Sequence, residues 1–455
     1  MQTVRGVLSV FLAVLALATC VQAQTSEPAR IASAVDSIVA AALEGGRAAG
    51  ASVAVVRGAD TLVMKGYGHA DLEFDVATPD RAIYEIGSVT KQFTAAAVLQ
   101  LVEQGKVNLD AQITEYLPAY PLQGHTLTVR RLLDHTSGIK GYTELPEFGE
   151  LMVRKLPRDS LVSIFSAKPF DFAPGEAMVY NNSAYFLLGL IIEKTSGMKY
   201  EDYVQKNLFE RVGMADSRYC SERAVVKRRA NGYDARPDGL LRAAYLDHTW
   251  PYAAGSLCST VGDLVAWNRA LHGGKLLTAE SYRELITPGS LNDGSRLRYA
   301  MGLSVDSLLG QRTIRHGGGI NGFLSDLSYF PDHDLTIAVL VNTAGPVDPG
   351  SITRSIAESI FGKWTPATAR FNGKAADYVG EYRGVGRGRE LIVRIAAGED
   401  ALTIQVGDGQ PSPLVYLGQE TFARDGSRYT FVRANGGVSG LRADNVGGYS
   451  ILTRK

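Results

Sequence analysis

Residues 85–91 of this chain are Glu-Ile-Gly-Ser-Val-Thr-Lys, and they place a serine three positions before a lysine. After Lys91, apolar residues recur at nearly helical spacing as far as Gly105, which predicts a helix beginning near Ser88. Positions i and i+3 share one helix face, so the two side chains should meet. A lysine shielded from water has a lowered pKa and can accept the serine proton. The stretch therefore predicts a nucleophilic serine, and a helix-capping serine beside a solvated lysine is the alternative.

Two more motifs follow in an order that matters. Tyr180-Asn181-Asn182 comes after a Pro-Gly turn and precedes an amphipathic helical pattern, for which Asn182 or Ser183 is the predicted N-cap. Residues 316–319, His-Gly-Gly-Gly, end a short strand-like run at 313–315. Serine-x-x-lysine, then tyrosine-x-asparagine, then a basic residue with glycine two positions on, is the three-part layout of the penicillin-recognising serine hydrolases.

On these motifs the chain resembles the class C β-lactamase family, which includes D-alanyl-D-alanine carboxypeptidases, D-aminopeptidases and carboxylesterases. The resemblance extends from about Ala32 to Trp364. Further matching segments are 132–138, 188–193, 213–214, 255–260 and 302–303. Such a series in one order is far more specific than a single motif, which favours the nucleophilic interpretation of Ser88 over the capping one.

The resemblance implies roles for the motif residues. Ser88 should attack a carbonyl and form an acyl-enzyme, with Lys91 and Tyr180 working together as the base; the sequence does not divide the proton between them. Asn182 should bind Lys91 or a carbonyl of the acyl group, and the alternative is that it only caps the next helix.

The glycines after position 316 are expected to line the substrate cleft. The oxyanion hole should combine the backbone N–H groups of Ser88 and Gly319, while the missing side chains at Gly317, Gly318 and Gly319 let a substrate lie close to the strand. His316 departs from the family, because β-lactamases usually carry a lysine there that holds the substrate carboxylate. A histidine is largely neutral at pH 7, so this substitution disfavours β-lactams and is compatible with esters and peptides.

Composition limits the range of partners. The 455 residues include equal numbers of basic and acidic side chains, 47 each, without a basic block or stripe, which argues against nucleic acid and anionic membrane surfaces. No His, Cys and carboxylate residues have metal-ligand spacing, His248 and other histidines stand alone in the sequence, and we predict neither a metal nor a cofactor.

The first 23 residues have the pattern of a signal peptide, with Arg5 before an apolar stretch and a small-residue cleavage site at 21–23. We therefore expect an exported protein, periplasmic or secreted, without a membrane span. Cys20 offers a competing lipid-anchor interpretation, which the threonine before it disfavours. Cys220 and Cys258 remain after cleavage, and either a disulfide or two buried thiols fits the sequence.

The remaining chain divides into two expected domains. Residues 24–364 should form an α/β sandwich of an antiparallel sheet and a helical subdomain, as the resemblance to the β-lactamase/transpeptidase fold implies. A linker is predicted at 365–374, and 375–455 contain short apolar runs separated by turn residues, which predict a small all-β barrel similar to a lipocalin-like domain. We see no catalytic group in this second domain and expect it to support packing or restrict substrates.

These observations predict an exported serine hydrolase that acts on esters or on peptide and amide bonds of small substrates. The alternatives are a β-lactamase or penicillin-binding DD-carboxypeptidase, and a non-catalytic binding protein with the same fold. The sequence indicates no oligomeric state.

Overall fold

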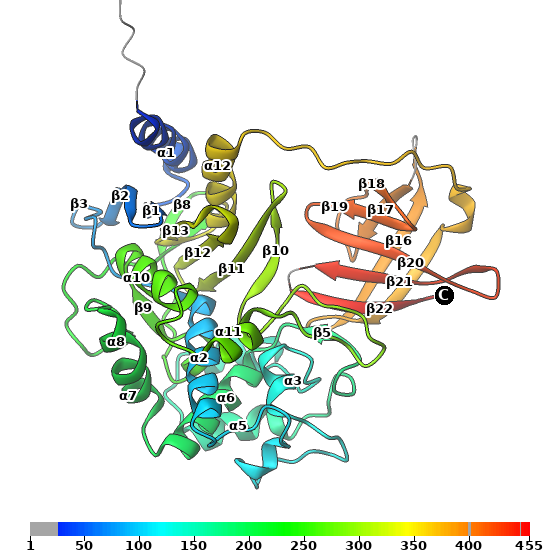
Figure 1. Ribbon diagram of the computed structural model, residues 1–455, viewed down its shortest axis with the longest axis horizontal. Helices are drawn as coiled ribbons and strands as arrows, with labels where there is room; N and C mark the ends of the chain where they lie inside the picture. Colours follow the sequence, from blue (N-terminus) through cyan, green and yellow to red (C-terminus); the bar gives the residue numbers. More distant parts are fainter. Residues whose placement is uncertain (1–25, 399–401, 446) are drawn as a thin grey trace, which may run out of the picture.

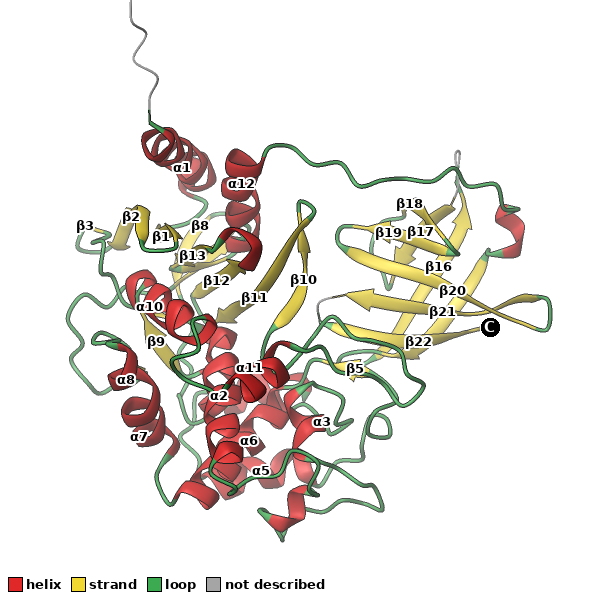
Figure 2. Cartoon of the chain, in the orientation of Figure 1, coloured by secondary structure: helices red, strands yellow, loops and turns green. Residues whose placement is uncertain are grey.

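The computed structural model describes residues 26–398, 402–445 and 447–455. The predicted signal peptide and Cys20 lie outside these residues. The main body contains a sheet flanked by helices, and a second, all-β body lies beside it (Figures 1 and 2). None of the helices within the described ranges is long and apolar enough to cross a membrane.

The main sheet has seven antiparallel strands in the order β10-β11-β12-β13-β1-β2-β3. Its central strands β1 and β13 are almost entirely buried, because alternate side chains of both enter a different core on each side of the sheet. The strands are β1 (Gly50–Arg57), β2 (Asp60–Asp71), β3 (Val76–Ala77), β10 (Ser304–Leu308), β11 (Gln311–Ile320), β12 (Phe323–Phe330) and β13 (Leu335–Val341).

Helices cover both faces of this sheet (Figure 1). The terminal helices α1 (Glu27–Leu43) and α12 (Pro349–Phe361) pack together over one face. The large helical part covers the other face and surrounds the buried helix α2 (Thr90–Glu103). Its remaining helices are α3 (Val129–Leu133), α4 (Phe148–Leu151), α5 (Arg158–Ser166), α6 (Asn182–Ser196), α7 (Tyr200–Val204), α8 (Glu210–Val212), α9 (Tyr252–Gly255), α10 (Val261–His272) and α11 (Ala279–Ile286).

Two small sheets complete this part. One has the order β4-β9-β6 and the other β14-β7-β8. A disulfide between Cys220 and Cys258 joins the first sheet to the loop after β6, so the structure decides between the two interpretations that the sequence left open. The strands are β4 (Tyr84–Glu85), β6 (Arg218–Tyr219), β7 (Tyr233–Arg236), β8 (Gly239–Arg242), β9 (Leu257–Ser259) and β14 (Thr343–Ala344).

Strand β11 is longer than the sequence indicates. The strand-like run at 313–315 and Gly319, which we expected on the strand, both fall within β11, and the strand continues to Ile320. Glycine has weak strand preference, yet here the backbone of each glycine pairs with β12, from Gly317 opposite Asp326 to Gly319 opposite Leu324. Pairing with a strong neighbouring strand therefore overrides local preference.

The C-terminal part is a closed antiparallel barrel of eight strands, β15 to β22, in which β15 also pairs with β22. Its interior is packed with aromatic and aliphatic side chains, including Tyr382, Phe422 and Phe431. The strands are β15 (Gly380–Val385), β16 (Glu390–Ala397), β17 (Leu402–Val406), β18 (Ser412–Gly418), β19 (Thr421–Arg424), β20 (Ser427–Ala434), β21 (Gly437–Asn445) and β22 (Gly448–Arg454). Six of these strands overlap the short apolar runs of the sequence, and β19 and β21 were missed. The runs are 378–382, 391–395, 402–406, 414–417, 429–432 and 450–453.

The barrel is joined to the helical part by more than the segment 362–374. Strand β5 (Met178–Val179) of the helical part pairs with β22, as Val179 opposite Gly448 and Met178 opposite Tyr449 (Figure 1). Met178 and Tyr449 also share a small apolar cluster.

Arg298 adds an ionic connection between the two bodies. Its side chain is 11% exposed and contacts Asp306 of β10 at 2.7 Å and Asp444 of β21 at 3.0 Å. The two bodies therefore share backbone, apolar and charged contacts.

Candidate active site

Ser88 lies at the junction between β4 and α2, on a 3-10 turn at Gly87–Val89. The turn needs glycine at position 87, where φ is +49° and a Cβ would lie 2.9 Å from the backbone of Gly319. This close approach places strand β11 directly beside the turn. Ser88 is half-buried, whereas Gly87 and Val89 on either side are buried. The turn thus presents one serine to the cleft on a rigid support.

Lys91 follows in the first turn of α2 and is fully buried. Its Nζ lies 3.0 Å from the Oγ of Ser88, 2.8 Å from the Oδ1 of Asn182 and 2.8 Å from the carbonyl oxygen of Ala254. The last two atoms only accept hydrogen bonds. A neutral amine can donate to both of them and accept from the Ser88 hydroxyl with its lone pair. The geometry thus suits a lysine that takes the serine proton.

The electrostatic surroundings favour the neutral amine. Burial, and secondly the nearby Arg387 cation, hold the pKa of Lys91 well below its ordinary value, while Glu144 opposes this effect. Burial raises the pKa of the Tyr180 phenol above its ordinary value, and the neighbouring Ser88 hydroxyl and Arg387 only partly offset the rise. Both pKa directions favour Lys91 over Tyr180 as the proton acceptor in the free site.

Asn182 is held ready for Lys91 because its neighbour does the capping. The side chain of Asn181, not Asn182 or Ser183 as the sequence suggested, accepts from the N–H of Ala184 at 3.0 Å and caps α6. Asn182 is then the first residue of the helix, and its amide accepts from Lys91 and donates to the Oγ1 of Thr143 at 3.2 Å.

Tyr180 stands between the lysine and the barrel. The Nζ of Lys91 lies 4.7 Å from the centre of its ring, and the ring of His135 packs against it at 4.3 Å. Its backbone N–H donates to the carbonyl oxygen of Gly447 in the barrel at 3.1 Å. Its hydroxyl is shielded from solvent and has no hydrogen-bond partner within the described ranges. A buried hydroxyl without a partner is uncommon in proteins, and this one neighbours the hydroxyl of Ser88.

A chain of hydrogen bonds connects His135 to His316 and determines the protonation of both. The N–H of Asn181 donates to Nδ1 of His135, so Nε2 of that ring carries the proton and donates to the hydroxyl of Tyr299 at 3.2 Å. Tyr299 donates to Nε2 of His316 at 2.9 Å, and Nδ1 of His316 donates to the carbonyl oxygen of Gly317. When both histidine rings are neutral, each of these four contacts contains one hydrogen atom, with a donor on one side and an acceptor on the other.

His316 is therefore not a substitute for a lysine cation. Burial, followed by the repulsion of Lys91, lowers its pKa to about 3. The same two causes hold the pKa of His135 well below its ordinary value. The loop at 135–139 supports the site, because His135 accepts from the backbone N–H of Asn181 and the Ile139 carbonyl oxygen accepts from the Asn181 side chain.

Gly318 and Gly319 bring β11 against Ser88. A Cβ at Gly318 would collide with the carbonyl oxygen of Ile86 and with Ser325, and would lie 3.1 Å from the backbone nitrogen of Ser88. The two predicted oxyanion donors, at Ser88 and Gly319, thus belong to backbones that lie in contact.

Arg387 is the site residue that the sequence analysis missed. It lies between β15 and β16 of the barrel, and its Nε contacts the Oε1 of Glu144 at 2.6 Å. Its guanidinium carbon lies 5.3 Å from the centre of the Tyr180 ring. We expected the barrel to support packing or restrict substrates without naming a residue, and the sequence signal for Arg387 was an arginine between two glycines in a predicted turn.

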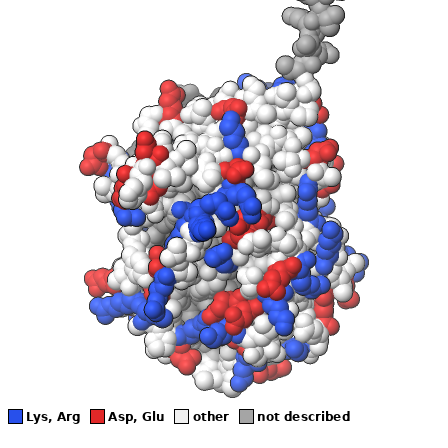
Figure 3. All heavy atoms as spheres, turned by 90° about the vertical axis from the view of Figure 1, so that its left-hand side faces the viewer, with Lys and Arg blue, Asp and Glu red and all other residues white. Residues whose placement is uncertain are grey.

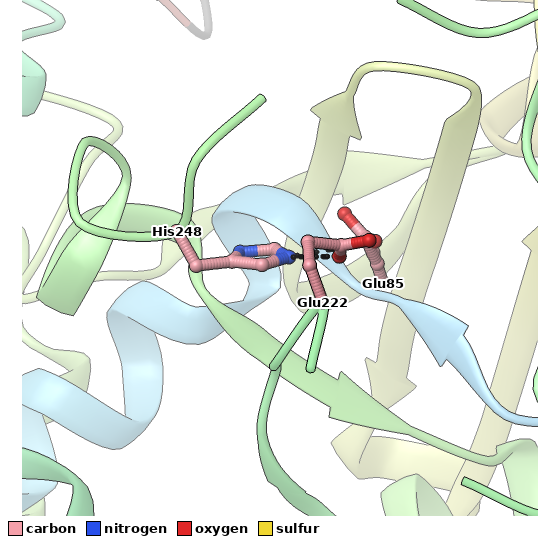
Figure 4. Close-up of side chains that lie close together, drawn as sticks. All are labelled: Glu85, Glu222 and His248. Carbon is pink, nitrogen blue, oxygen red and sulfur yellow. Dashed lines mark ion pairs between the residues drawn. The ribbon is translucent and has the colours of Figure 1, made fainter. Parts of the chain in front are cut away.

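A second charged cluster includes Glu85, which precedes Ser88 by three residues in the sequence. Figure 4 shows the ring of His248 directed at the carboxylates of Glu85 and Glu222, at 3.5 and 3.3 Å. Arg229 contacts the same two carboxylates. Although burial opposes it, the two carboxylates raise the pKa of His248 to about 9.

His248 therefore does not stand alone, as its place in the sequence suggested. The ligand atoms of Glu85, Glu222 and His248 lie within 4.8 Å of one another, which the sequence spacing did not indicate, and Arg229 forms ion pairs with both carboxylates. More widely, on the face drawn in Figure 3, basic and acidic side chains lie side by side rather than in separate fields.

Comparison with known proteins extends these observations. The profile of the family described as Beta-lactamase matches residues 35–359. Penicillin-binding protein 4* of Bacillus subtilis is 28% identical over 307 residues, which cover 64% of this chain and 67% of that protein. Protein flp of Staphylococcus aureus is 24% identical and is matched over 62% of its length. The chain thus spans about two thirds of these relatives or less.

Solved structures match the main body alone or the main body together with part of the barrel. A D-stereospecific amidohydrolase from Streptomyces, 27% identical with a TM-score of 0.62, covers 72% of this chain, and the match spans 98% of that protein. An octameric penicillin-binding protein homologue from Pyrococcus abyssi, 24% identical with a TM-score of 0.64, covers 92% of this chain and 99% of its own, so its fold also corresponds to part of the C-terminal barrel. By the profile match over most of its length, the chain belongs to the beta-lactamase family of serine hydrolases.

Proposed function

We propose that this protein is an exported serine hydrolase that forms an acyl-enzyme on Ser88 and acts on esters or on D-amino-acid peptides and amides. The observation that carries the proposal is the 3.0 Å distance between the Nζ of a fully buried Lys91 and the Oγ of Ser88. Similarity to a D-stereospecific amidohydrolase supports the amide substrates. Export is supported by the signal-peptide pattern at 1–23.

Acylation begins with proton transfer from Ser88 to the neutral amine of Lys91 as Oγ attacks the substrate carbonyl. Negative charge develops on the carbonyl oxygen, where the N–H groups of Ser88 and Gly319 stabilise it. Asn182 and the Ala254 carbonyl hold the resulting ammonium by the contacts that they already make with Lys91. Because these acceptors are in place before the reaction, the site needs little rearrangement when charge appears.

Tyr180 supplies the proton to the leaving group. Its phenol is protonated in the free site, and it recovers a proton from the Lys91 ammonium once it has released its own. The leaving alcohol or amine then departs. A water molecule attacks the acyl-enzyme while Lys91 accepts its proton, and Lys91 returns that proton to the Oγ of Ser88 as the ester bond breaks and the acid product leaves. The lysine is thus the base of both half-reactions and the tyrosine is the acid of the first.

The neutral His316 directs the proposal toward esters and D-peptides rather than cephalosporins. Its nitrogens are occupied by Tyr299 and the Gly317 carbonyl, so it offers a substrate carboxylate neither a charge nor a free N–H. We expect kcat/KM for p-nitrophenyl butyrate or a D-alanyl peptide to exceed that for nitrocefin. A preference for nitrocefin of a hundredfold or more, roughly 2.7 kcal/mol of transition-state stabilisation, contradicts this expectation and favours a β-lactamase.

Covalent labelling tests the catalytic part of the proposal. Folded protein incubated with a fluorophosphonate probe or a labelled penicillin should gain one adduct on Ser88, detected by mass spectrometry of the peptides. Ser88→Ala is the matched control and should remain unlabelled. Failure of both probes to modify Ser88 in folded protein leaves the non-catalytic binding protein as the better assignment.

A further inference from the structure

The turn between β15 and β16 is built to reach the active site. Its tip is Gly386-Arg387-Gly388, and the backbone of Gly388 has a φ of +70°. A Cβ at Gly388 would lie 2.7 Å from the Cβ of Glu144, so the turn packs directly against the loop beside Lys91. An arginine on a flexible surface turn would not need a glycine in this conformation and at this distance.

Glu144 positions the guanidinium rather than receiving a substrate. Its side chain is 13% exposed, and its Oε1 accepts from Nε of Arg387 at 2.6 Å and from the Oγ1 of Thr143 at 2.7 Å. Arg387 is 46% exposed, and one N–H of Nη2 contacts Thr143 at 3.4 Å. These contacts leave the outer edge of the fork, with Nη1, free to bind an anion in the bidentate geometry that suits carboxylates.

Among the described residues that contact Ser88, Lys91 and Tyr180 or the hydrogen-bonded chain from His135 to His316, no other side chain offers an equivalent free cation. The tautomers of His135 and His316 are neutral, and the amine of Lys91 is engaged with Ser88, Asn182 and Ala254. The guanidinium of Arg387 lies 5.3 Å from the centre of the Tyr180 ring, on the residue that delivers the proton to the leaving group. If Tyr180 is the acid, a cation over its ring lies near the leaving group of a bound substrate.

We propose that Arg387, supplied by the C-terminal barrel, is a specificity-determining residue that binds a free carboxylate on the leaving group of the substrate. It would make the protein favour peptides that end in a free carboxylate over the same peptides ending in a carboxamide. This inference rests on the proposed function only for the place of the leaving group. Glu144 acts through Arg387, as a positioning residue.

Binding to an inactive variant tests the inference without turnover. In Ser88→Ala, we would measure the Kd of N-acetyl-D-alanyl-D-alanine and of its C-terminal carboxamide by calorimetry. A charge-assisted bidentate contact predicts that the carboxylate peptide binds about tenfold more tightly or better. Adding Arg387→Ala should reduce this ratio to within about twofold, and Arg387→Lys should keep part of it, because it keeps the charge and loses the fork.

Arg389, two residues along the same turn and exposed, provides the matched control. Arg389→Ala in the Ser88→Ala background should retain the full carboxylate preference. The inference is overturned if the two peptides bind alike, if neither binds at millimolar concentration, or if Arg387→Ala weakens both by the same factor, which indicates a structural role.

The two proposals can fail separately. Labelled Ser88 in the unmodified protein, without a carboxylate preference in Ser88→Ala, refutes only the role of Arg387. A carboxylate preference that depends on Arg387, in a protein whose Ser88 is never labelled, supports Arg387 and refutes the acyl-enzyme.

Discussion

The two sides of the active site are assembled in different ways. Ser88 and Lys91 are three residues apart, and a single turn of chain brings their side chains together. Arg387 and Glu144 are 243 residues apart and meet only because the barrel packs against the helical part. The first pair depends on local geometry and the second on an interface. The chemistry of the nucleophile should therefore tolerate changes at the interface better than substrate selection does.

The largest effect is expected within the local pair. Ser88→Ala should lower kcat/KM for p-nitrophenyl butyrate by about 10³-fold or more, and Lys91→Ala by a similar factor. Adding Lys91→Ala to Ser88→Ala should cost little more, because groups that share one mechanism are not additive. Activity of the double variant far below that of Ser88→Ala would mean that the two residues act independently.

The next effect concerns the interface. Arg298→Met should lower the free energy of unfolding by about 3 kcal/mol, since it leaves Asp306 and Asp444 close together without their shared cation. Arg57→Met is the matched control, because its partner Glu27 is 53% exposed and the loss should stay below about 1 kcal/mol. Urea unfolding measures both, and equal losses would show that the Arg298 contacts do not stabilise the interface.

A pH-dependent effect is expected from the cluster before Ser88. The pKa of His248 is about 9 in the folded protein against 6.5 as its ordinary value. The stability that its charge adds is complete below pH 6.5 and is lost as pH rises through 9. The stability difference between the unmodified protein and His248→Gln should therefore shrink from pH 6 to pH 9.5, as measured by urea unfolding.

His272 provides a control of opposite sign. Burial lowers the pKa of His272 to about 3, so the folded protein holds this ring neutral. The free energy that the buried neutral ring contributes to stability is present above pH 6.5 and is lost as pH falls toward 3, because the unfolded chain then binds a proton that the folded protein does not. The difference between the unmodified protein and His272→Gln should shrink below pH 6.5. Parallel pH profiles for the two variants would contradict the ion-pair assignment of His248.

The smallest effect concerns two glycines in turns of the barrel, and it distinguishes backbone strain from loss of the contact with Glu144. Gly388→Ala and Gly436→Ala both place an alanine at positive φ, +70° and +79°, and each should cost about 1 kcal/mol in thermal unfolding. Only Gly388 lies against Glu144, whereas Gly436 has open space around it. Of the two variants, only Gly388→Ala should reduce the preference for the carboxylate dipeptide. An equal reduction in Gly436→Ala would contradict the claim that contact between the Gly388 turn and Glu144 positions Arg387.

Much of the framework was predictable because it follows from local patterns. The apolar run at 402–406 coincides with β17, and the helical pattern after Lys91 corresponds to α2. The strands β19 and β21 were missed since their polar and glycine residues carry little alternation, and their pairing partners form them.

The sequence by itself indicated the candidate nucleophile and base, because the spacing of Ser88 and Lys91 brings them together in any fold that forms the helix after Ser88. Only the tertiary structure decided their surroundings. Burial sets the protonation of Lys91, contacts with Tyr299 and Gly317 keep His316 neutral, and barrel packing brings Arg387 to the site. Backbone periodicity controls separations of a few residues, whereas charge state and distant contacts depend on what the complete fold excludes from water and brings together.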